Sequence, residues 1–375
     1  EINAYYERIM KERFLPSGRV SYFPLCAYTG DGKFKSMITG KGYEIDVNKK
    51  IVDTTYLKTN IPATHTPNFS IAPEAQFIPI NDLPKIVHPP KGFVIIGGGK
   101  TGIDACLWLL EHQVDPDKIT WIMPRDAWLL DRRNTQPTKD FFEYAIGAQA
   151  NQFEAIVQAE SIPDLFDRLE TKGVLLRIDT NVRPKMFHGA TVSPLELEQL
   201  RRIKHIVRMG RVKHIKGNEI VLDEGTISTT PEIVHVDCSA SALSNFETKP
   251  IFSNHLITPQ TVRSYQPVFS AAFIAHVEAT YESEEKKNEL CKVVPLPNHD
   301  TDWIKLLAAY MMNQYRWNQD PDLRKWLYNN RLDGFSKLVA QVSKDDMEKQ
   351  SILKRMRDNI PPAMQKLQQF IAELS

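Results

Sequence analysis

The sequence feature that most constrains the fold is a glycine-rich loop between two apolar segments, FVIIGGGKTGIDACLWLL at residues 93–110. The apolar run 93–96 is typical of a buried parallel strand, and the run 103–110 is typical of an apolar helix. A further apolar run, 119–123, follows at the distance expected for the next strand of a strand–helix–strand unit. The sequence therefore predicts an α/β fold with parallel strands.

Gly97, Gly99 and Gly102 have the G-x-G-x-x-G spacing of dinucleotide-binding loops. In such a loop the first glycine permits a tight turn, the second lets the backbone approach a diphosphate, and the third lets the helix pack closely on the strand. The first N–H groups of the helix then face the phosphates. We predict a diphosphate-binding loop, with a glycine-rich turn of some other α/β protein as the alternative. Its residues are Gly97, Gly98, Gly99, Lys100, Thr101 and Gly102.

The end of the second strand of such a unit distinguishes NAD from NADP. NAD sites place an acidic residue there for the ribose 2′-hydroxyl, whereas NADP sites use an arginine for the 2′-phosphate. This chain reads IMPRD over 122–126, so we predict NADP, with NAD as the alternative, and assign Arg125 to the nucleotide. The competing interpretation is an ion pair of Arg125 with Asp126 or Asp131. Further positive charge nearby is predicted from Arg132 and Arg133.

Outside this unit the chain carries both strand-like and helical patterns. Residues 2–14 have helical spacing, and residues 19–57 are typical of strands with turns at 30–32 and 40–42. The proline-rich segment 58–91 is typical of a linker. Further helices are predicted at 138–172, 302–330, 335–357 and 361–374, and further strands at 174–178, 205–213, 219–222 and 233–238.

Composition narrows the classes of partner. A length of 375 residues suits more than one domain, and a net charge of +1 gives no large field for binding nucleic acid or an anionic membrane. The four cysteines are scattered, which argues against a metal site and indicates a reducing, cytoplasmic setting. We therefore expect a small-molecule substrate, no metal, no nucleic acid and no membrane.

Three segments of the chain carry a family resemblance: IIGGGKTGIDACLWLL at 95–110, ITWIMPRDAWLLDR at 119–132 and FSAAFIAHVEA at 269–279. They resemble the bacterial FAD/NAD(P)-dependent oxidoreductases related to flavin-containing monooxygenases. In that family an NADPH-binding domain is inserted into an FAD-binding domain. VDTTYL at 52–57 is similar to the first crossover between the two domains, and VDCSASAL at 236–243 is similar to the return crossover.

The resemblance implies an α/β architecture in which a Rossmann-type NAD(P)-binding domain is inserted in a partial FAD-binding domain, followed by a C-terminal helical region. The expected domains are 1–88 (partial FAD-type), 89–235 (NAD(P)-binding) and 236–375 (the return to the FAD-type domain and the C-terminal helices). The crossovers add four residues to the expected cofactor-binding set, Thr54, Thr55, Ser239 and Ala240.

Two departures from the family pattern bear on the reaction. The N-terminal FAD fingerprint, a second strand–glycine loop–helix, is missing before the strands of 19–57. We expect the numbering to begin inside a longer enzyme, and the alternative is that the chain has lost flavin binding. FIPINDLP at 77–84 has the expected phenylalanine but lacks the glycine and histidine of many monooxygenases. Plain NAD(P)H oxidation or reduction therefore stays open beside oxygenation.

The function implied by the resemblance is transfer of hydride from NADPH to FAD, with monooxygenation as one outcome. This chemistry belongs to the cofactors, so we assign no catalytic residue and no oligomeric state. A non-catalytic NAD(P)-binding scaffold without flavin is one alternative. A flavin-free Rossmann dehydrogenase is the other, and it would need a tyrosine–lysine pair that residues 127–160 do not supply convincingly.

Overall fold

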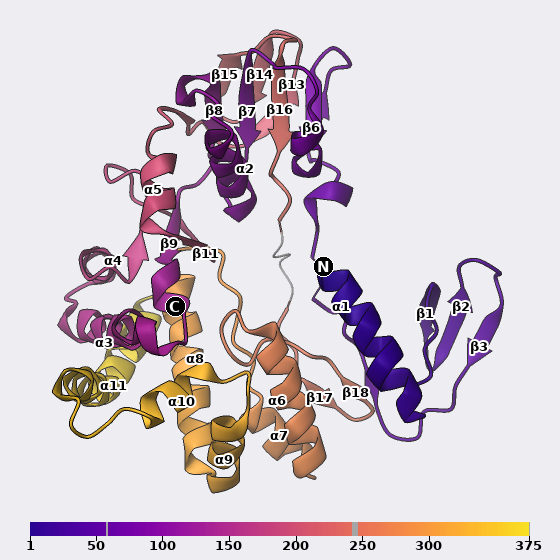
Figure 1. Cartoon of the computed structure of the whole chain (residues 1–375), viewed down its shortest axis with the longest axis vertical. Helices are drawn as coiled ribbons and strands as arrows, with labels where there is room; N and C mark the ends of the chain where they lie inside the picture. Colours follow the sequence, from indigo (N-terminus) through magenta and orange to yellow (C-terminus); the bar gives the residue numbers. More distant parts are fainter. Residues whose placement is uncertain (58, 242–246, 375) are drawn as a thin grey trace. The chain divides into compact units, whose positions relative to one another are not determined.

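Helices and strands are mixed through most of the chain, as expected for an α/β protein. The computed structural model describes residues 1–57, 59–241 and 247–374 (Figure 1). Residue contacts divide the chain into two units. The first is Glu1–Asp53 with Phe252–Ile257, and the second is Thr54–Ile251 with Thr258–Ser375. The division into FAD-type and NAD(P)-type domains at residues 88 and 235 stays a prediction.

The first unit begins with helix α1 (Ile2–Ile9), which continues as a π-helical turn to Phe14 and confirms the helix predicted over 2–14. Within the segment 19–57, for which strands were predicted, residues 19–25 form no strand, so that part of the prediction is wrong. The first strand begins at Cys26 and pairs across the predicted turn at 30–32, where the short connection sets the register. Two small sheets follow, with orders β1-β2-β3 and β17-β18-β4. Their strands are β1 (Cys26–Gly30), β2 (Lys33–Ser36), β3 (Gly42–Glu44), β4 (Ile51–Val52), β17 (Phe252–Ser253) and β18 (Leu256–Ile257).

Residues 1–53, all of which the structure describes, bury very little of their apolar surface. Gly32 is the only fully buried residue among them. Large apolar side chains of α1 and of the strand region are exposed; Ile2 is 70% exposed and Ile38 is 75% exposed. A helix with an apolar face gains its stability by packing that face. This unit therefore carries an apolar surface that its own residues do not cover.

The second unit is built around a five-stranded parallel sheet with the order β12-β8-β7-β16-β6. The predicted strands at 93–96, 119–123 and 233–238 are its three inner strands, which confirms them. The proline-rich segment 58–91 is not a plain linker, since it supplies the edge strand β6; Lys58 lies outside the described residues. Pro79 ends that strand at the sheet edge, where proline is tolerated. The strands are β6 (Gln76–Pro79), β7 (Gly92–Ile96), β8 (Ile119–Ile122), β12 (His205–Val207) and β16 (Ile233–Asp237).

Both faces of this sheet are covered, which explains the uninterrupted apolar runs of its strands. Side chains alternate along β7, so Phe93 and Ile95 face a core shared with helix α2 (Lys100–Glu111). Val94 and Ile96 face the opposite core, which is shared with a second sheet of order β15-β14-β13-β5. The strands of that second sheet are β5 (Ser70–Ile71), β13 (Val212–Ile215), β14 (Glu219–Leu222) and β15 (Gly225–Ser228).

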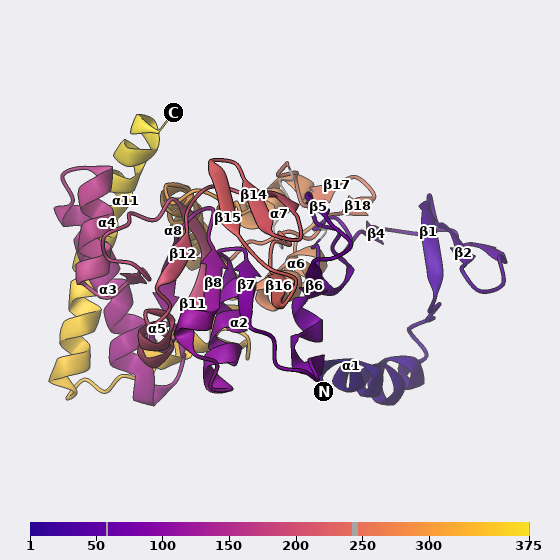
Figure 2. The same cartoon turned by 90° about the horizontal axis from the view of Figure 1, so that it is seen from above.

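Between β8 and β12 the chain leaves the parallel sheet and builds a separate structure. A three-stranded sheet of order β10-β9-β11 packs with helices from both this excursion and the C-terminal region, around Trp128, Phe166 and Trp303. Figure 2 shows α3 and α11 lying side by side in this part. The elements of the excursion are β9 (Ala127–Asp131), α3 (Phe142–Gln158), α4 (Ile162–Thr171), β10 (Leu175–Leu176), β11 (Met186–Val192) and α5 (Pro194–Leu200).

The C-terminal region is helical, as predicted, but its boundaries differ. The long last helix continues through Pro361 and Pro362, so the predicted new start at Pro361 is wrong. Leu353 and Leu367 are buried on either side of the prolines, and this continuous apolar face offsets the helix-breaking effect of proline. The helices are α6 (Pro267–Thr280), α7 (Glu284–Leu290), α8 (Asp302–Gln319), α9 (Pro321–Asn329), α10 (Gly334–Ala340) and α11 (Met347–Glu373).

A search of the helices for a membrane-crossing segment gives a negative result. Within the described ranges, no helix is both long enough and apolar enough to span a bilayer.

Candidate functional site

The glycine loop leaves the carboxyl end of β7, where Ile96 is in register with Asp237 at the end of β16. Gly97 has a φ of +131°, and a Cβ at this position would overlap the carbonyl oxygen of Cys238. A Cβ at Gly98 would lie 2.8 Å from the carbonyl oxygen of Arg125. The loop is therefore held on both sides by the segments that follow the neighbouring strands, and any side chain at these two positions would open it.

The other two glycines of the motif differ in what surrounds them. A Cβ at Gly102 would overlap the carbonyl oxygen of Gly97, an oxygen that also accepts a 2.8 Å hydrogen bond from Nε1 of Trp121. Gly102 thus lets α2 pack against the turn, in the way the spacing predicts. A Cβ at Gly99 would meet no atom within 4 Å, so the backbone of Gly99 borders open space.

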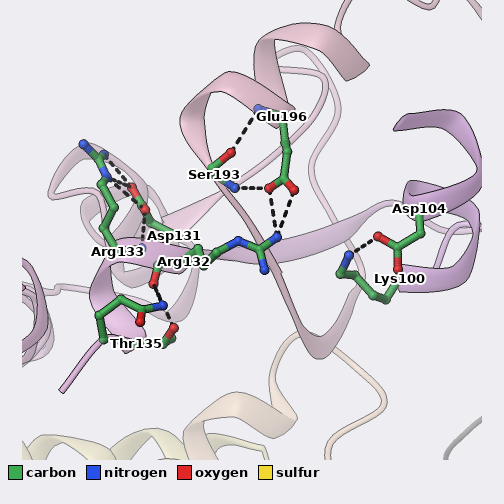
Figure 3. A network of polar contacts seen from close by, with 9 residues as sticks. Lys100, Asp104, Asp131, Arg132, Arg133, Thr135, Ser193 and Glu196 are labelled. Carbon is green, nitrogen blue, oxygen red and sulfur yellow. Dashed lines mark hydrogen bonds and ion pairs between the residues drawn. The ribbon is translucent and has the colours of Figure 1, made fainter. Parts of the chain in front are cut away.

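Helix α2 begins directly after Gly99 without a side-chain cap among the described residues. An uncapped helix start carries N–H groups and a partial positive charge that favour an anion. Lys100 and Thr101 are the first two helical residues. The ammonium group of Lys100 pairs with Asp104 one turn along α2, as Figure 3 shows, so its charge is partly compensated. The backbone N–H groups of this turn are therefore better placed than the Lys100 side chain to donate hydrogen bonds to an anion.

The end of β16 lies against the same loop. The side chain of Asp237 is buried and accepts from both the backbone N–H (2.9 Å) and the hydroxyl (2.6 Å) of Ser239. His65 Nε2 lies 3.5 Å from the same hydroxyl. Cys238 is buried, and burial raises the pKa of its thiol well above the usual range, with Asp237 and Asp104 adding to the effect. Ser239 and the half-buried Ala240 thus belong to the surroundings of the loop, and their role as cofactor contacts stays a prediction.

The segment after β8 answers the question of how Arg125 is paired. Asp126 is buried and accepts two hydrogen bonds from Arg208, at 2.8 and 2.9 Å. Asp131 is held by Arg133. Neither carboxylate is therefore the partner of Arg125, and Arg125 forms no ion pair within the described chain. The competing interpretation, a structural ion pair of Arg125 with Asp126 or Asp131, is wrong, because other arginines already pair with both carboxylates.

Arg125 instead belongs to a neutral hydrogen-bond network. Its Nη2 donates to Oδ1 of Asn298 at 2.9 Å, and Nε2 of His188 lies 3.1 Å from the same oxygen. Burial lowers the pKa of the Arg125 guanidinium, and the positive charge of Arg211 lowers it further. Burial also lowers the pKa of His188, the bond to Asn298 opposes this, and Arg125 adds to the lowering. The result is a half-buried positive charge without a counter-ion in the described chain.

Arg132 and Arg133, which we expected to add charge, are both paired. Arg132 donates to both oxygens of Glu196 at the start of α5, at 3.0 and 2.9 Å, and Arg133 pairs with Asp131 (Figure 3). A cavity of about 490 Å³ lies next to Arg133 and is bounded by α3 and α5. None of the predicted cofactor-binding residues lines this cavity, so it is not the site predicted from the glycine loop.

The first predicted crossover is represented by Thr54 and Thr55, which are exposed. Tyr56 of the same segment donates its hydroxyl to the carbonyl oxygen of Glu247, and Lys249 lies over its ring at 5.1 Å. The first predicted crossover therefore contacts residues that follow the return crossover in the sequence. The last residues of the return crossover, Ala242 and Leu243, lie outside the described residues.

Sequence reasoning missed the contributions of His188, Asn298 and Asp237. Asn298 bonds to Arg125 across 173 positions of the chain, and to His188 across 110. No local pattern predicts such contacts. Asp237 had a usable signal, because a carboxylate at the end of an inner parallel strand lies at the edge where ligands bind.

Comparison with known proteins adds relatives but no activity. No protein-family model matches the chain. An uncharacterized protein of Mycobacterium bovis is 48% identical over 343 residues, which cover 92% of this chain and 64% of that protein. Uncharacterized proteins of two Mycobacterium tuberculosis strains show the same identity and coverage. The chain thus spans 64% of the length of the curated relatives it matches.

Proposed function

We propose that this chain binds NADPH at the loop Gly97–Gly102 and is the pyridine-nucleotide part of a flavin-dependent oxidoreductase. One observation carries the proposal. The uncapped start of α2 and the open space at Gly99 lie together at the carboxyl end of the central parallel strand. A diphosphate at this point would receive backbone N–H donors and the positive end of the helix dipole.

The order of the parallel strands supports a Rossmann-type interpretation of this sheet. From β7 the chain proceeds to β8 and β12 on one side, and only later adds β16 on the other. The strand order therefore reverses between β7 and β16. In open α/β sheets, ligands bind outside the carboxyl ends of the strands at such a reversal. The glycine loop and Ser239 lie at this place in the sheet.

The charges near the end of β8 favour NADP over NAD. An NAD site needs a free carboxylate for the ribose 2′-hydroxyl, but Asp126 is already bound by Arg208. A 2′-phosphate needs a cation, and Arg125 is a half-buried guanidinium with no carboxylate partner in the described chain. Arg211 contributes positive potential at the same place. A phosphate would offset the repulsion between these two arginines.

The flavin part of the proposal rests on the resemblance to FAD/NAD(P)-dependent oxidoreductases. The described residues contain one strand–glycine loop–helix unit, and it is assigned to NADPH. The diphosphate of FAD would therefore need a cradle from polypeptide outside the described residues. The uncovered apolar surface of residues 1–53 is a suitable docking face for it. The four cysteines are free thiols, which supports a reducing, cytoplasmic setting.

When bound, NADPH supplies a hydride and FAD accepts it. The residues of this chain would hold and orient the nucleotide. The backbone from Gly99 to Gly102 would bind the diphosphate, and Arg125 would bind the 2′-phosphate. Asp237 fixes the turn at Ser239 beside the loop.

A flavin spectrum combined with nucleotide kinetics tests this function. Cofactor released from the full-length protein should give the absorbance bands of oxidised flavin, and NADPH should be consumed faster than NADH. Preference for NADH would overturn the role of Arg125, and a colourless full-length protein would overturn the flavin part. Absence of any nucleotide binding would overturn the site itself.

A second candidate, a non-catalytic NAD(P)-binding scaffold, is favoured by the same uncovered apolar surface of residues 1–53. Such a surface can serve as a platform for a partner chain. The scaffold would bind NADP⁺ but would carry no flavin and would consume no NADPH. The spectrum and the kinetics described above therefore separate the two functions.

A further inference from the structure

The guanidinium of Arg125 is held by an uncharged acceptor. Its only hydrogen-bond partner among the described side chains is Oδ1 of Asn298, at 2.9 Å. A guanidinium has five N–H donors in a fixed plane. One bond to Asn298 therefore fixes the direction of the side chain and leaves the remaining donors for another acceptor.

The acceptor itself is held by further contacts of its side chain and of the backbone around it. Nε2 of His188 also lies 3.1 Å from Oδ1 of Asn298. Because an arginine can only donate, it is the amide oxygen of Asn298 that faces both groups. The backbone N–H groups of Asn298 and His299 donate to Oδ2 of Asp302, at 3.0 and 2.9 Å. His299 is bridged to Met186 at the start of β11. Asn298 is thus fixed between β11 and the start of α8.

A carboxylate in the place of Asn298 would have held Arg125 equally well but would have cancelled its charge. Nearby carboxylates do act in this way on other arginines, as Asp126 does on Arg208 and Asp131 on Arg133. Arg125 differs from them in that its charge is kept while its direction is fixed. This arrangement suits a side chain that must present positive charge to an anion.

We propose that Asn298 is a positioning residue that aims Arg125 at the 2′-phosphate and so sets the preference for NADP over NAD. The inference rests on the proposed NADPH site. It extends that site to the C-terminal half of the chain, since Asn298 lies just before α8. Discrimination between the two nucleotides would then depend on a residue 173 positions from the arginine.

The test compares two small probes that differ only in the 2′-phosphate, 2′,5′-ADP and 5′-AMP. Calorimetric titration of the full-length protein should show tighter binding of 2′,5′-ADP, and Arg125→Ala should remove this preference. In Asn298→Ala the affinity ratio should fall roughly tenfold, the size of one charge-assisted hydrogen bond, while 5′-AMP affinity stays the same. In Asn298→Asp, which keeps an acceptor but adds a negative charge, the ratio should fall further.

Asn151→Ala is the matched control, because Oδ1 of Asn151 in α3 accepts from Nη2 of Arg355 in α11 at 2.7 Å, and both side chains are partly buried. This variant should keep the wild-type ratio. Equal loss of both ligands in Asn298→Ala and Asn298→Asp, or an unchanged ratio, overturns the positioning role while leaving the nucleotide site intact. A wild-type protein that binds neither probe overturns the proposed site and this inference with it. Asn298→Asp retains the hydrogen bonds, so it tests the positioning role even if Asn298→Ala unfolds.

Discussion

At the scale of single residues, the glycines of the loop serve two separable purposes. Gly97, Gly98 and Gly102 are required by their own surroundings, because a Cβ at each would collide with backbone atoms. Gly99 has no such neighbour, and its φ of −87° suits any residue. Its small size therefore has no structural reason in the described chain, which is the pattern expected where a ligand approaches the backbone.

Alanine substitutions should separate these purposes. Gly102→Ala should lower the free energy of unfolding by about 1–3 kcal/mol through overpacking against Gly97. Gly99→Ala should change stability by less than about 0.5 kcal/mol and yet weaken NADP⁺ binding. Chemical denaturation and titration calorimetry measure the two effects. As a control, Gly147→Ala in α3, where a Cβ meets nothing, should raise stability by about 0.5–1 kcal/mol. Full NADP⁺ affinity in Gly99→Ala would contradict the proposed role of the loop.

His235 makes a second residue-scale prediction, concerning pH. It is fully buried between Oγ1 of Thr229 and the carbonyl oxygen of Gln76, at 2.9 Å from each, and burial lowers its pKa although the bond to Gln76 opposes this. The unfolded state then binds more protons, so stability rises with pH. We expect the free energy of unfolding to fall as the pH drops from 6.5, the ordinary pKa of histidine, through the lowered pKa of His235 in the folded protein.

His235→Gln should be less stable at neutral pH and should lose part of this pH dependence. The measurement is urea denaturation at a series of pH values, with the exposed His88→Gln as a control. An identical slope in His235→Gln and the wild type would show that another group is responsible.

At the scale of elements, helix α5 shows how a short helix is fixed next to the parallel sheet. Ser193 and Glu196 form a capping box, in which the Ser193 hydroxyl accepts from the backbone N–H of Glu196 at 3.1 Å and the Glu196 carboxylate accepts from that of Ser193 at 2.5 Å. Glu196 also binds Arg132. One side chain thus caps α5 and connects it to the segment after β9.

Removal of this cap gives an element-scale prediction. Ser193→Ala should lower the free energy of unfolding by about 1 kcal/mol, because the start of α5 loses its side-chain acceptor. Thr301→Ala is the control, since Thr301 precedes α8 without a side-chain cap bond, and it should have almost no effect. Equal effects of the two substitutions in thermal or chemical denaturation would contradict the role of the cap.

How far the sequence predicts the elements depends on how local their determinants are. The strands at 93–96, 119–123 and 233–238 were predictable because sheets covered on both faces require continuous apolar runs. Strands β9 and β11 were not predicted, since β9 follows directly on the segment assigned to the nucleotide and β11 carries Gly189 with a φ of +67°. The glycine loop is determined by a short local motif, so the sequence predicts it. The contact of Arg125 with Asn298 is made by folding and has no local signal.

At the scale of the whole molecule, burial is distributed very unevenly along the chain. All five residues of β7 are buried, whereas helix α1 has no buried residue. Amide protection follows burial and hydrogen bonding, so units with little buried surface open at low free energy. The two compact units should therefore differ in local stability.

Hydrogen–deuterium exchange of the chain should show this difference directly. Amides of residues 1–53 should exchange at least tenfold faster than those of β7 and β8, because a difference of about 1.4 kcal/mol in opening free energy suffices. Peptide-resolved mass spectrometry measures the rates. Equal protection in both regions would mean that residues 1–53 are covered by another copy or a partner in solution.

The position of β16 in the sheet has a consequence for biosynthesis. In the described sheet, β6 pairs only with β16. Gln76 of β6 also bonds to Pro231, which lies 155 positions later in the chain and just before β16, so β6 leaves the ribosome long before its partner strand. During translation, β6 therefore stays unpaired until the segment that contains β16 has been synthesised. The proposed nucleotide site beside Ser239 is complete only once Asp237 has left the exit tunnel, so we expect that a nascent chain does not bind NADPH before then.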